Sequence, residues 1–262
     1  MMDVLIHLEH ISVISENFEI LRDITLSFPS GKSTVILGPS GCGKSTLLKA
    51  AAGILIPDSG SLLIDGKDFI KMSEKEIKSF RRHNGFVFQD SALWDNRTIY
   101  QNLSLPLEYH FPERSADQIK SRVVELLDRT GLYSQAYLRP AQLSTGERKL
   151  VSFLRALATE PTLLFMDEPT PSVDTKKAGF IHESLRDLKL NGCTMIAITH
   201  DQSLTSWLAD YLVVLVEGRV LESGPFDEVK NSSNPAVRSV LSSILAEAAS
   251  FDTDILGLLD EE

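Results

Sequence analysis

Cysteine is scarce in this sequence, with Cys42 and Cys193 as the two examples among 262 residues. Two cysteines this far apart form neither a metal-ligand cluster nor the disulfide framework of a small secreted domain. We therefore expect both to be reduced thiols in a cytoplasmic protein.

Long hydrophobic runs are also missing. The most apolar windows, 47–56 and 211–216, fall well short of the roughly 18 residues that suggest a membrane-spanning helix. The N-terminal segment carries acidic residues and lacks a basic stretch followed by an apolar one, so it does not resemble a signal peptide. Any role at a membrane is expected to come through a partner.

Basic residues are outnumbered, with 26 Lys and Arg against 36 Asp and Glu and a net charge of −10. Because general nucleic-acid binders present a basic face, we expect no nucleic-acid partner. Hydrophobic residues make up 43% of the chain, enough for a sizeable core, which argues against disorder of the whole chain. The length fits one large α/β domain or two small ones.

The hydrophobic patterns predict an α/β fold. Residues 5–13 and 20–28 alternate with a period of two and predict a hairpin. Further strands are predicted at 33–37, 62–64, 163–166, 194–199, 211–216 and 219–221, and helical patterns at 47–55, 119–127, 147–159 and 178–190. The strand–helix–strand order between 163 and 199 is typical of a parallel sheet covered by helices.

The strongest motif is G-x-x-x-x-G-K-[ST], placed between a predicted strand and a predicted helix. Its glycines let backbone N–H groups turn toward phosphates, and the following helix presents its positive end to them. Lys44 is expected to reach the β- and γ-phosphates, and the Ser45 hydroxyl to ligate Mg²⁺. The predicted nucleotide loop is Gly38, Pro39, Ser40, Gly41, Cys42, Gly43, Lys44, Ser45 and Thr46. The alternative is a glycine turn with a surface lysine, which the strand and helix flanks disfavour.

Polar side chains follow two of the predicted buried strands. Asp167 suits the role of holding Mg²⁺ through water, and Glu168 that of orienting and deprotonating the attacking water. His200 could contact the γ-phosphate, and Gln89 could touch Mg²⁺ or the water. Such residues also end strands for purely structural reasons, so the catalytic interpretation depends on the phosphate loop beside them.

In order and spacing, these motifs resemble the nucleotide-binding subunit of ABC transporters across nearly the whole chain. The matching segments are 38–46, Gln89, 143–147 (LSTGE), 163–168, 172–174 (SVD) and His200. The resemblance implies a P-loop NTPase that uses ATP and Mg²⁺, with a RecA-like core, an antiparallel β subdomain and a helical signature subdomain at about 91–158. The nucleotide-binding domain would span 1–230, followed by a helical and acidic extension at 231–262.

The resemblance also implies roles for single residues. Gln89 would be the Q-loop residue that couples the site to a membrane partner, His200 the switch histidine, and Asp174 part of the D-loop. Because 143–147 resembles the signature LSGGQ, Ser144 and Gly146 would close on the ATP held by a second subunit. Two complete sites would then form only in a head-to-tail homodimer, with ATP between the subunits.

The chain departs from the family pattern in the signature and in the stretch where an adenine-stacking residue is expected. Thr145 stands in place of the second signature glycine, and Glu147 replaces the usual glutamine. Ile14 and Ser15 occupy the stretch where an adenine-stacking aromatic is expected, so Phe18, the nearest ring, is expected to substitute. We expect these changes to slow turnover or loosen base selectivity without abolishing activity.

The segment 88–108 lies where the family docks its membrane partner and resembles the phospholipid-trafficking, Mla-type group. That resemblance implies phospholipid movement in the bacterial envelope, at the cytoplasmic face of the inner membrane. The implied partners are an integral membrane permease, an MCE-domain lipid-binding protein and a small regulatory subunit. The alternatives are lipoprotein release, solute uptake, or a soluble ABC ATPase that acts on a macromolecule. A phosphotransferase gives no reason for the signature or for His200.

Beyond Pro225 the sequence changes character. Val237, Val240, Leu241, Ile244 and Leu245 fall on one helical face, and apolar residues recur in the acidic segment 251–259. This extension is expected either to pack on its own domain or to contact a second subunit or a regulator.

Overall fold

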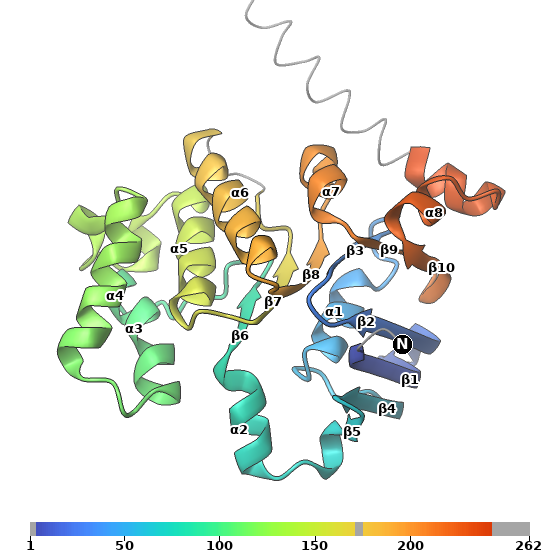
Figure 1. Cartoon of the computed structure of the whole chain (residues 1–262), viewed down its shortest axis with the longest axis horizontal. Coiled ribbons are helices and arrows are strands. Elements are labelled where there is room, and N and C mark those ends of the chain that lie inside the picture. Colours follow the sequence, from blue (N-terminus) through green and yellow to red (C-terminus); the bar gives the residue numbers. More distant parts are fainter. Residues whose placement is uncertain (1–3, 171–174, 243–262) are drawn as a thin grey trace, which may run out of the picture. The chain divides into compact units, whose positions relative to one another are not determined.

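The computed structural model describes residues 4–170 and 175–242 and divides into two compact units (Figure 1). The first unit contains the residues up to Ile70 and those from Ile196 onward, and the second contains Lys71–Met195. The division falls inside strand β8 (Thr194–Ile198). The predicted boundaries at about 91–158 and at 230 stay a prediction.

The first unit contains an antiparallel sheet built on the N-terminal hairpin. Its strands are β1 (Val4–Ser15), β2 (Phe18–Pro29), β4 (Ser59–Ile64) and β5 (Lys67–Asp68), in the order β2-β1-β4-β5. The hairpin turn consists of Glu16 and Asn17, whose φ angles of 48° and 67° suit a two-residue turn between twisted strands. Alternate apolar side chains of β1, such as Ile6, are fully buried. The predicted hairpin is confirmed.

The same unit also holds a parallel strand pair that leads into the phosphate loop. Strand β3 (Ser33–Leu37) lies parallel to β9 (Tyr211–Val216), which pairs antiparallel with β10 (Arg219–Pro225). The helices of this unit are α1 (Lys44–Ala51), α7 (Gln202–Leu208) and α8 (Phe226–Lys230). Helix α1 overlaps the predicted range 47–55, but it begins and ends a few residues earlier than that range. Gly43 starts the helix, and Gly53, with a φ of 63°, turns the chain.

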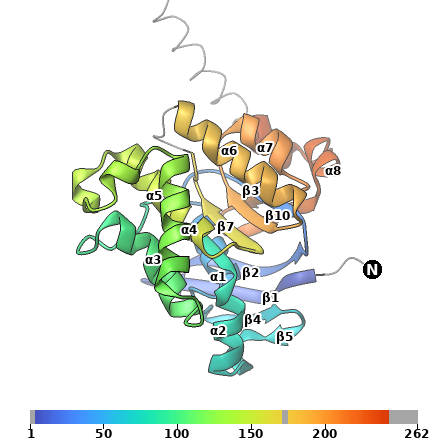
Figure 2. The same cartoon turned by 60° about the vertical axis from the view of Figure 1, so that its left-hand side comes forward.

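The second unit combines a short parallel pair with packed helices. Strand β6 (Asn84–Val87) lies parallel to β7 (Leu163–Asp167). Its α-helices are α2 (Glu74–Arg82), α3 (Ile99–His110), α4 (Ala116–Arg129), α5 (Thr145–Ala158) and α6 (Thr175–Leu190), with 3₁₀ turns at Tyr133–Gln135 and Pro140–Gln142. Helices α3, α4 and α5 pack against one another (Figure 2). The predicted helices are confirmed. Helix α2 is not predicted by the hydrophobic pattern, because none of its residues is buried.

Capping boxes fix where several of these helices begin. Ser73, Thr98, Ser115 and Ser144 each accept a bond from the backbone N–H three residues later, where a Glu or Gln bonds back. The start of α5 is therefore set by its local sequence. This matters because α5 opens with the signature residues.

The C-terminal part is described only as far as residue 242. Residues 235–242 are helical, and Val237 and Leu241 are buried within the described structure. Their burial favours packing on the chain's own unit. Ile244, Leu245 and the segment 251–259 lie outside the described residues, so their contact with a second subunit stays a prediction. Within the described ranges, no helix has the length and apolar character needed to cross a membrane.

Candidate functional site

The phosphate loop follows β3 directly and is shaped by close backbone approaches. A Cβ at Gly38 would collide with the Leu215 carbonyl, and one at Gly43, whose φ is 105°, would lie 3.0 Å from the Ile20 carbonyl oxygen. Gly43 is also the N-cap of α1, and no side chain caps this helix end. The first N–H groups of α1 are therefore available to an anion.

Lys44 lies at the centre of this loop. Its side chain is 9% exposed, and its Nζ donates to the carbonyl oxygens of Gly38, at 2.7 Å, and Pro39, at 2.9 Å. The ammonium is thus held against the first two residues of the loop, where phosphates are expected to bind. Burial raises the pKa of the Cys42 thiol, while the positive charge of Lys44 opposes that shift. Cys42 is therefore a neutral thiol in the wall of the loop.

Cys193 lies in the second unit and is likewise a free, buried thiol. Burial raises the pKa of Cys193 to about 12, so the thiol stays protonated and unreactive. Both cysteines are thus free, as the scarcity of cysteine predicts.

Phe18 lies beside the phosphate loop, although it precedes the loop by two strands. A cavity of about 420 Å³ is lined by residues 18–20 and Arg22, by the loop residues 39–42 and by the turn 216–218. The Phe18 ring is 65% exposed, and the Arg22 guanidinium lies 5.8 Å from its centre. An exposed ring next to the phosphate loop supports the expectation that Phe18 stacks on adenine.

Asp167 and Glu168, the two carboxylates predicted for the site, differ in their burial and backbone conformation. Asp167 ends the buried strand β7 and is 4% exposed. Glu168 has a φ of 52°, in the left-handed region that non-glycine residues rarely adopt. A residue before proline normally has an extended backbone, and Pro169 follows Glu168. The strand therefore ends in a strained turn at Glu168, a feature often found at functional sites.

One lysine joins the backbone of Gln89 to that of Asp167. The Nζ of Lys149, on α5, donates to the carbonyl oxygens of Phe88 and Gln89, both at 2.9 Å, and of Asp167, at 3.4 Å. Burial lowers the pKa of Lys149, and the carboxylates of Asp167 and Glu168 counteract that shift. The sequence gives little sign of this role for Lys149, which is a charged residue inside the apolar helical pattern 147–159.

The signature residues form the beginning of α5. Ser144 is the N-cap, and the Glu147 carboxylate accepts from its backbone N–H at 2.9 Å and from its hydroxyl at 2.8 Å. The Ser144 N–H and hydroxyl lower the pKa of Glu147, so this carboxylate stays charged at neutral pH. Ser144 and Gly146 thus share the helix start with a negative charge.

We expect Glu147→Gln to lower the ATP concentration needed for half-maximal subunit association. Glutamine keeps the capping box but removes the charge beside the helix end, a gain of about 1 kcal/mol or about fivefold. The measurement is association against ATP concentration in variants that also carry Glu168→Gln. Glu183→Gln, an exposed position on α6, is the control. An unchanged or higher ATP requirement would show that Glu147 does not repel the triphosphate.

His200 and Asp174 complete the predicted residues. His200 follows β8 and belongs to the first unit, together with the phosphate loop, and its side chain is exposed. Asp174 lies outside the described residues. Across the described chain, no cluster of three or more His, Cys, Asp or Glu side chains could hold a metal alone. Mg²⁺ is usually bound by one or two carboxylates together with substrate phosphates. Ser45 and Asp167 stay the predicted protein ligands.

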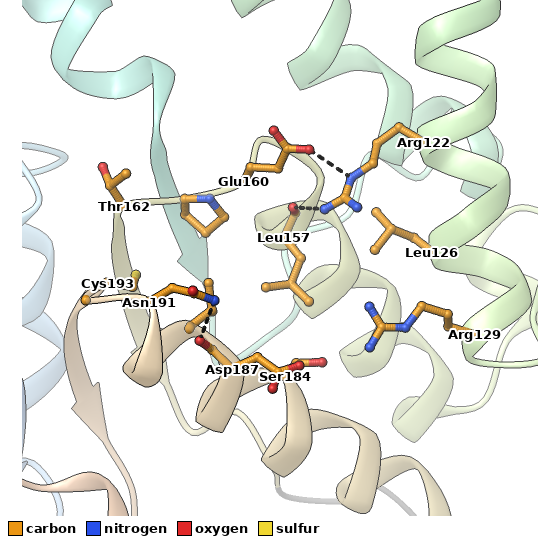
Figure 3. A pocket seen from close by; sticks show the side chains of 13 residues that line it. Arg122, Leu126, Arg129, Leu157, Glu160, Thr162, Ser184, Asp187, Asn191 and Cys193 are labelled. Atoms are coloured by element: carbon orange, nitrogen blue, oxygen red, sulfur yellow. Dashed lines mark hydrogen bonds and ion pairs between the residues drawn. The ribbon is translucent and has the colours of Figure 1, made fainter.

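A separate cavity of about 320 Å³ lies in the second unit, at the start of β7 and β8 rather than at their carboxyl ends (Figure 3). Arg122 crosses it and donates to the Leu157 carbonyl oxygen at 3.0 Å, and its Nε lies 3.9 Å from a Glu160 oxygen (Figure 3). These contacts join α4 to the end of α5. The cavity is therefore distinct from the edge that carries Asp167 and Glu168.

Comparison with known proteins identifies the family. The family model described as "ABC transporter" matches residues 21–171, more than half of the chain. The chain belongs to the ABC transporter family. ABC ATPases hydrolyse ATP with Mg²⁺, and this chain is one of them. The predicted fold class, enzyme class and cofactors are confirmed.

Particular relatives are similar over most of the chain. Methionine import ATP-binding protein MetN 1 of Rhodococcus jostii (strain RHA1) is 39% identical over 216 residues, which are 82% of this chain and 63% of that protein. Sulfate/thiosulfate import ATP-binding protein CysA of Mesostigma viride is 38% identical over 254 residues, covering 96% and 70%. This chain thus spans 63% and 70% of the lengths of these two proteins.

The solved structures agree with the family. A dimeric ATP-binding cassette in a post-hydrolysis state, bound to ADP and phosphate, has a TM-score of 0.77 at 29% identity, covering 84% of this chain and 98% of that chain. These two relatives are named as import ATP-binding proteins, which supports the ATP-binding subunit of an ABC transporter and gives no support to the Mla-type assignment or an MCE-domain partner.

Proposed function

We propose that the chain powers solute uptake as the ATPase subunit of an ABC importer, working as a homodimer on an integral membrane permease. The observation that carries this proposal is the presence in one chain of two different helix starts that suit phosphate binding. Helix α1 opens beside Lys44, and α5 opens with Ser144 and Gly146. In a head-to-tail pair, Ser144 and Gly146 of one copy complete the ATP site at Lys44 of the other copy.

The residue roles are part of the same proposal. Lys44 and the loop N–H groups bind the triphosphate, while Ser45 and Asp167 hold Mg²⁺. Glu168 accepts the proton of the attacking water, and His200 and Gln89 orient the γ-phosphate and that water. ATP then acts as the bond between subunits, and its hydrolysis releases them, which moves the permease.

A groove in the second unit fits the docking of the permease. It measures about 400 Å³ and is lined by Asn84, Gly85, Phe86, Phe88, Ala92, Trp94, Pro106, His110, Arg155, Ala156 and Thr159. The rings of Phe86 and Phe88 lie 4.2 Å apart, and Trp94 is 43% exposed. Aromatic side chains around a groove are typical of binding sites for a partner helix. Phe88 in this lining directly precedes Gln89, so a docked helix would lie next to the Q-loop.

The cargo is the finer part of the proposal. Part of the segment 88–108 that resembles the phospholipid-trafficking group is the pattern Asn-Leu-x-x-Pro-Leu at 102–107, which has a local structural explanation. Asn102 is fully buried and bonds the Trp94 N–H and the carbonyls of Trp94 and Thr98, while Leu103 and Leu107 are core residues. The named relatives import methionine and sulfate. The first observation removes a reason for phospholipid, and the second favours a small polar solute, which the permease would select.

Trp94→Ala is expected to weaken binding of the permease from detergent-solubilised membranes by about thirtyfold, since a central aromatic at an interface contributes about 2 kcal/mol. The measurement is affinity capture with the tagged chain followed by identification of bound proteins. Tyr137→Ala, which removes a ring that is 81% exposed elsewhere in the same unit, is the control. A multi-span membrane protein in the wild-type capture supports the proposal. Capture of ribosomes or nucleic acid instead would establish the macromolecule-directed alternative.

The purified complex, reconstituted in vesicles, then tests the cargo. A small polar solute such as methionine or sulfate is expected to accumulate on the side of the vesicle membrane where ATP is supplied. If ATP instead moves labelled phospholipid between membranes or leaflets, the chain belongs to lipid trafficking and the importer proposal fails.

A further inference from the structure

Helix α5 carries two buried cations that bind one loop through its backbone. Lys149 and Arg155 are 4% and 9% exposed. Lys149 Nζ donates to the carbonyl oxygens of Phe88 and Gln89 at 2.9 Å. Arg155 donates to those of Ser91 and Ala92, at 3.2 Å and 2.8 Å. The loop 88–92 is thus held from α5 at both of its ends.

This loop has a backbone that needs such support. Ser91 and Ala92 have φ angles of 67° and 41°, and neither is glycine. Two successive residues in this region are costly and persist only where surrounding contacts hold them. Because the contacts from α5 are made to carbonyl oxygens, they fix the path of the loop whatever side chains it carries.

Lys149 differs from Arg155 in having a third backbone partner. Its Nζ lies 3.4 Å from the carbonyl oxygen of Asp167, at the end of β7. The Lys149 ammonium therefore contacts the backbone of Gln89, the Q-loop residue, and the backbone of Asp167, which precedes Glu168. The same helix begins with Ser144 only five positions earlier. All of these residues belong to the second unit.

We propose that Lys149 is a positioning residue of the ATPase reaction, which holds Gln89 and Asp167 in fixed register with the signature end of α5. It acts through the backbone that it binds, not by contact with ATP. Closure of Ser144 and Gly146 on nucleotide then sets the positions of Gln89 and Glu168. The inference rests on the roles proposed above for these residues.

Lys149→Met tests this, because methionine has a similar length but no donor. We expect kcat to fall about ten- to a hundredfold, since a shift of about 1 Å in reacting groups has that effect. ATP affinity should stay within about threefold, because the phosphate loop lies in the other unit. Lys149→Gln, which keeps an N–H donor, should give an intermediate kcat and carries the test if the methionine variant does not fold. Lys120→Met, exposed on α4, is the control.

A double-mutant cycle with Gln89→Ala separates positioning from general damage. If Lys149 works through Gln89, its replacement should cost clearly less when the Gln89 amide is already gone. Additive effects, a normal kcat in folded Lys149→Met, or a parallel loss of ATP affinity would overturn the inference. Glu168→Gln is measured alongside. Normal turnover there would refute the site assignment itself, whereas a stalled Glu168→Gln with normal Lys149 variants defeats only the positioning role.

Discussion

Glu168→Gln is expected to lower kcat for ATP hydrolysis by about 10²–10⁴, the usual contribution of a general base. Glutamine has the size of glutamate and can still bond to water, but it cannot accept a proton at neutral pH. ATP binding depends on Lys44 and the loop N–H groups, so it should persist. Nucleotide would then stay between two subunits, and a closed dimer should accumulate with ATP.

The measurements are steady-state phosphate release and the mass of the ATP-bound species in solution. Glu160→Gln is the matched control, because Glu160 lies before β7 whereas Glu168 lies after it. Its contacts with Arg114 and Arg122 involve an exposed carboxylate and contribute little. Turnover near the wild-type rate in Glu168→Gln would refute the base assignment.

Lys44→Met is expected to reduce kcat/KM for ATP by about 10²–10³, comparable to the loss of a preorganised donor that faces developing charge. The defect should begin at binding, because the ammonium is the positive group held against the first two residues of the phosphate loop. The loop would also lose the contacts from Nζ to the Gly38 and Pro39 carbonyls. ATP titration and phosphate release together should show weak binding and no stable dimer.

Lys49→Met provides the comparison, since Lys49 lies on the same helix but beyond the loop. It should bind and hydrolyse ATP like the wild type. If Lys44→Met bound ATP normally, the phosphate loop would not be the nucleotide site. The two variants at Lys44 and Glu168 thus separate binding from chemistry.

The sequence was sufficient for most of the strands because they have clear periods or are continuously apolar. The hairpin of β1 and β2, the buried strand β3 and the end of β7 at Asp167 all follow from such patterns. Helix α2 does not follow from such patterns, because it has no buried face, and in the sequence its capping box at Ser73 marks only where it begins. A charge-rich helix without a core side gives the hydrophobic pattern nothing to detect.

The site was predictable in its motifs but not in its supports. The phosphate loop is one contiguous motif, and Asp167 and Glu168 end another, so local pattern finds each of them. Lys149 binds carbonyl oxygens some 60 residues away, and carbonyls are common to all residues. A bond between one side chain and distant backbone therefore leaves no pairing in the sequence. The Phe18 ring beside the phosphate loop was predicted from proximity to the motif position and lies in the same cavity.

The left-handed backbone at Glu168 sets stability against turnover at a single position. A glycine would adopt the φ of 52° without the roughly 1–2 kcal/mol that other residues incur there. Laboratory evolution that selects for heat resistance alone would therefore favour replacement of this glutamate by glycine. The selected variants are expected to be more stable but inactive in ATP hydrolysis. Only screens that demand catalysis at every round would keep the carboxylate in its unfavourable turn.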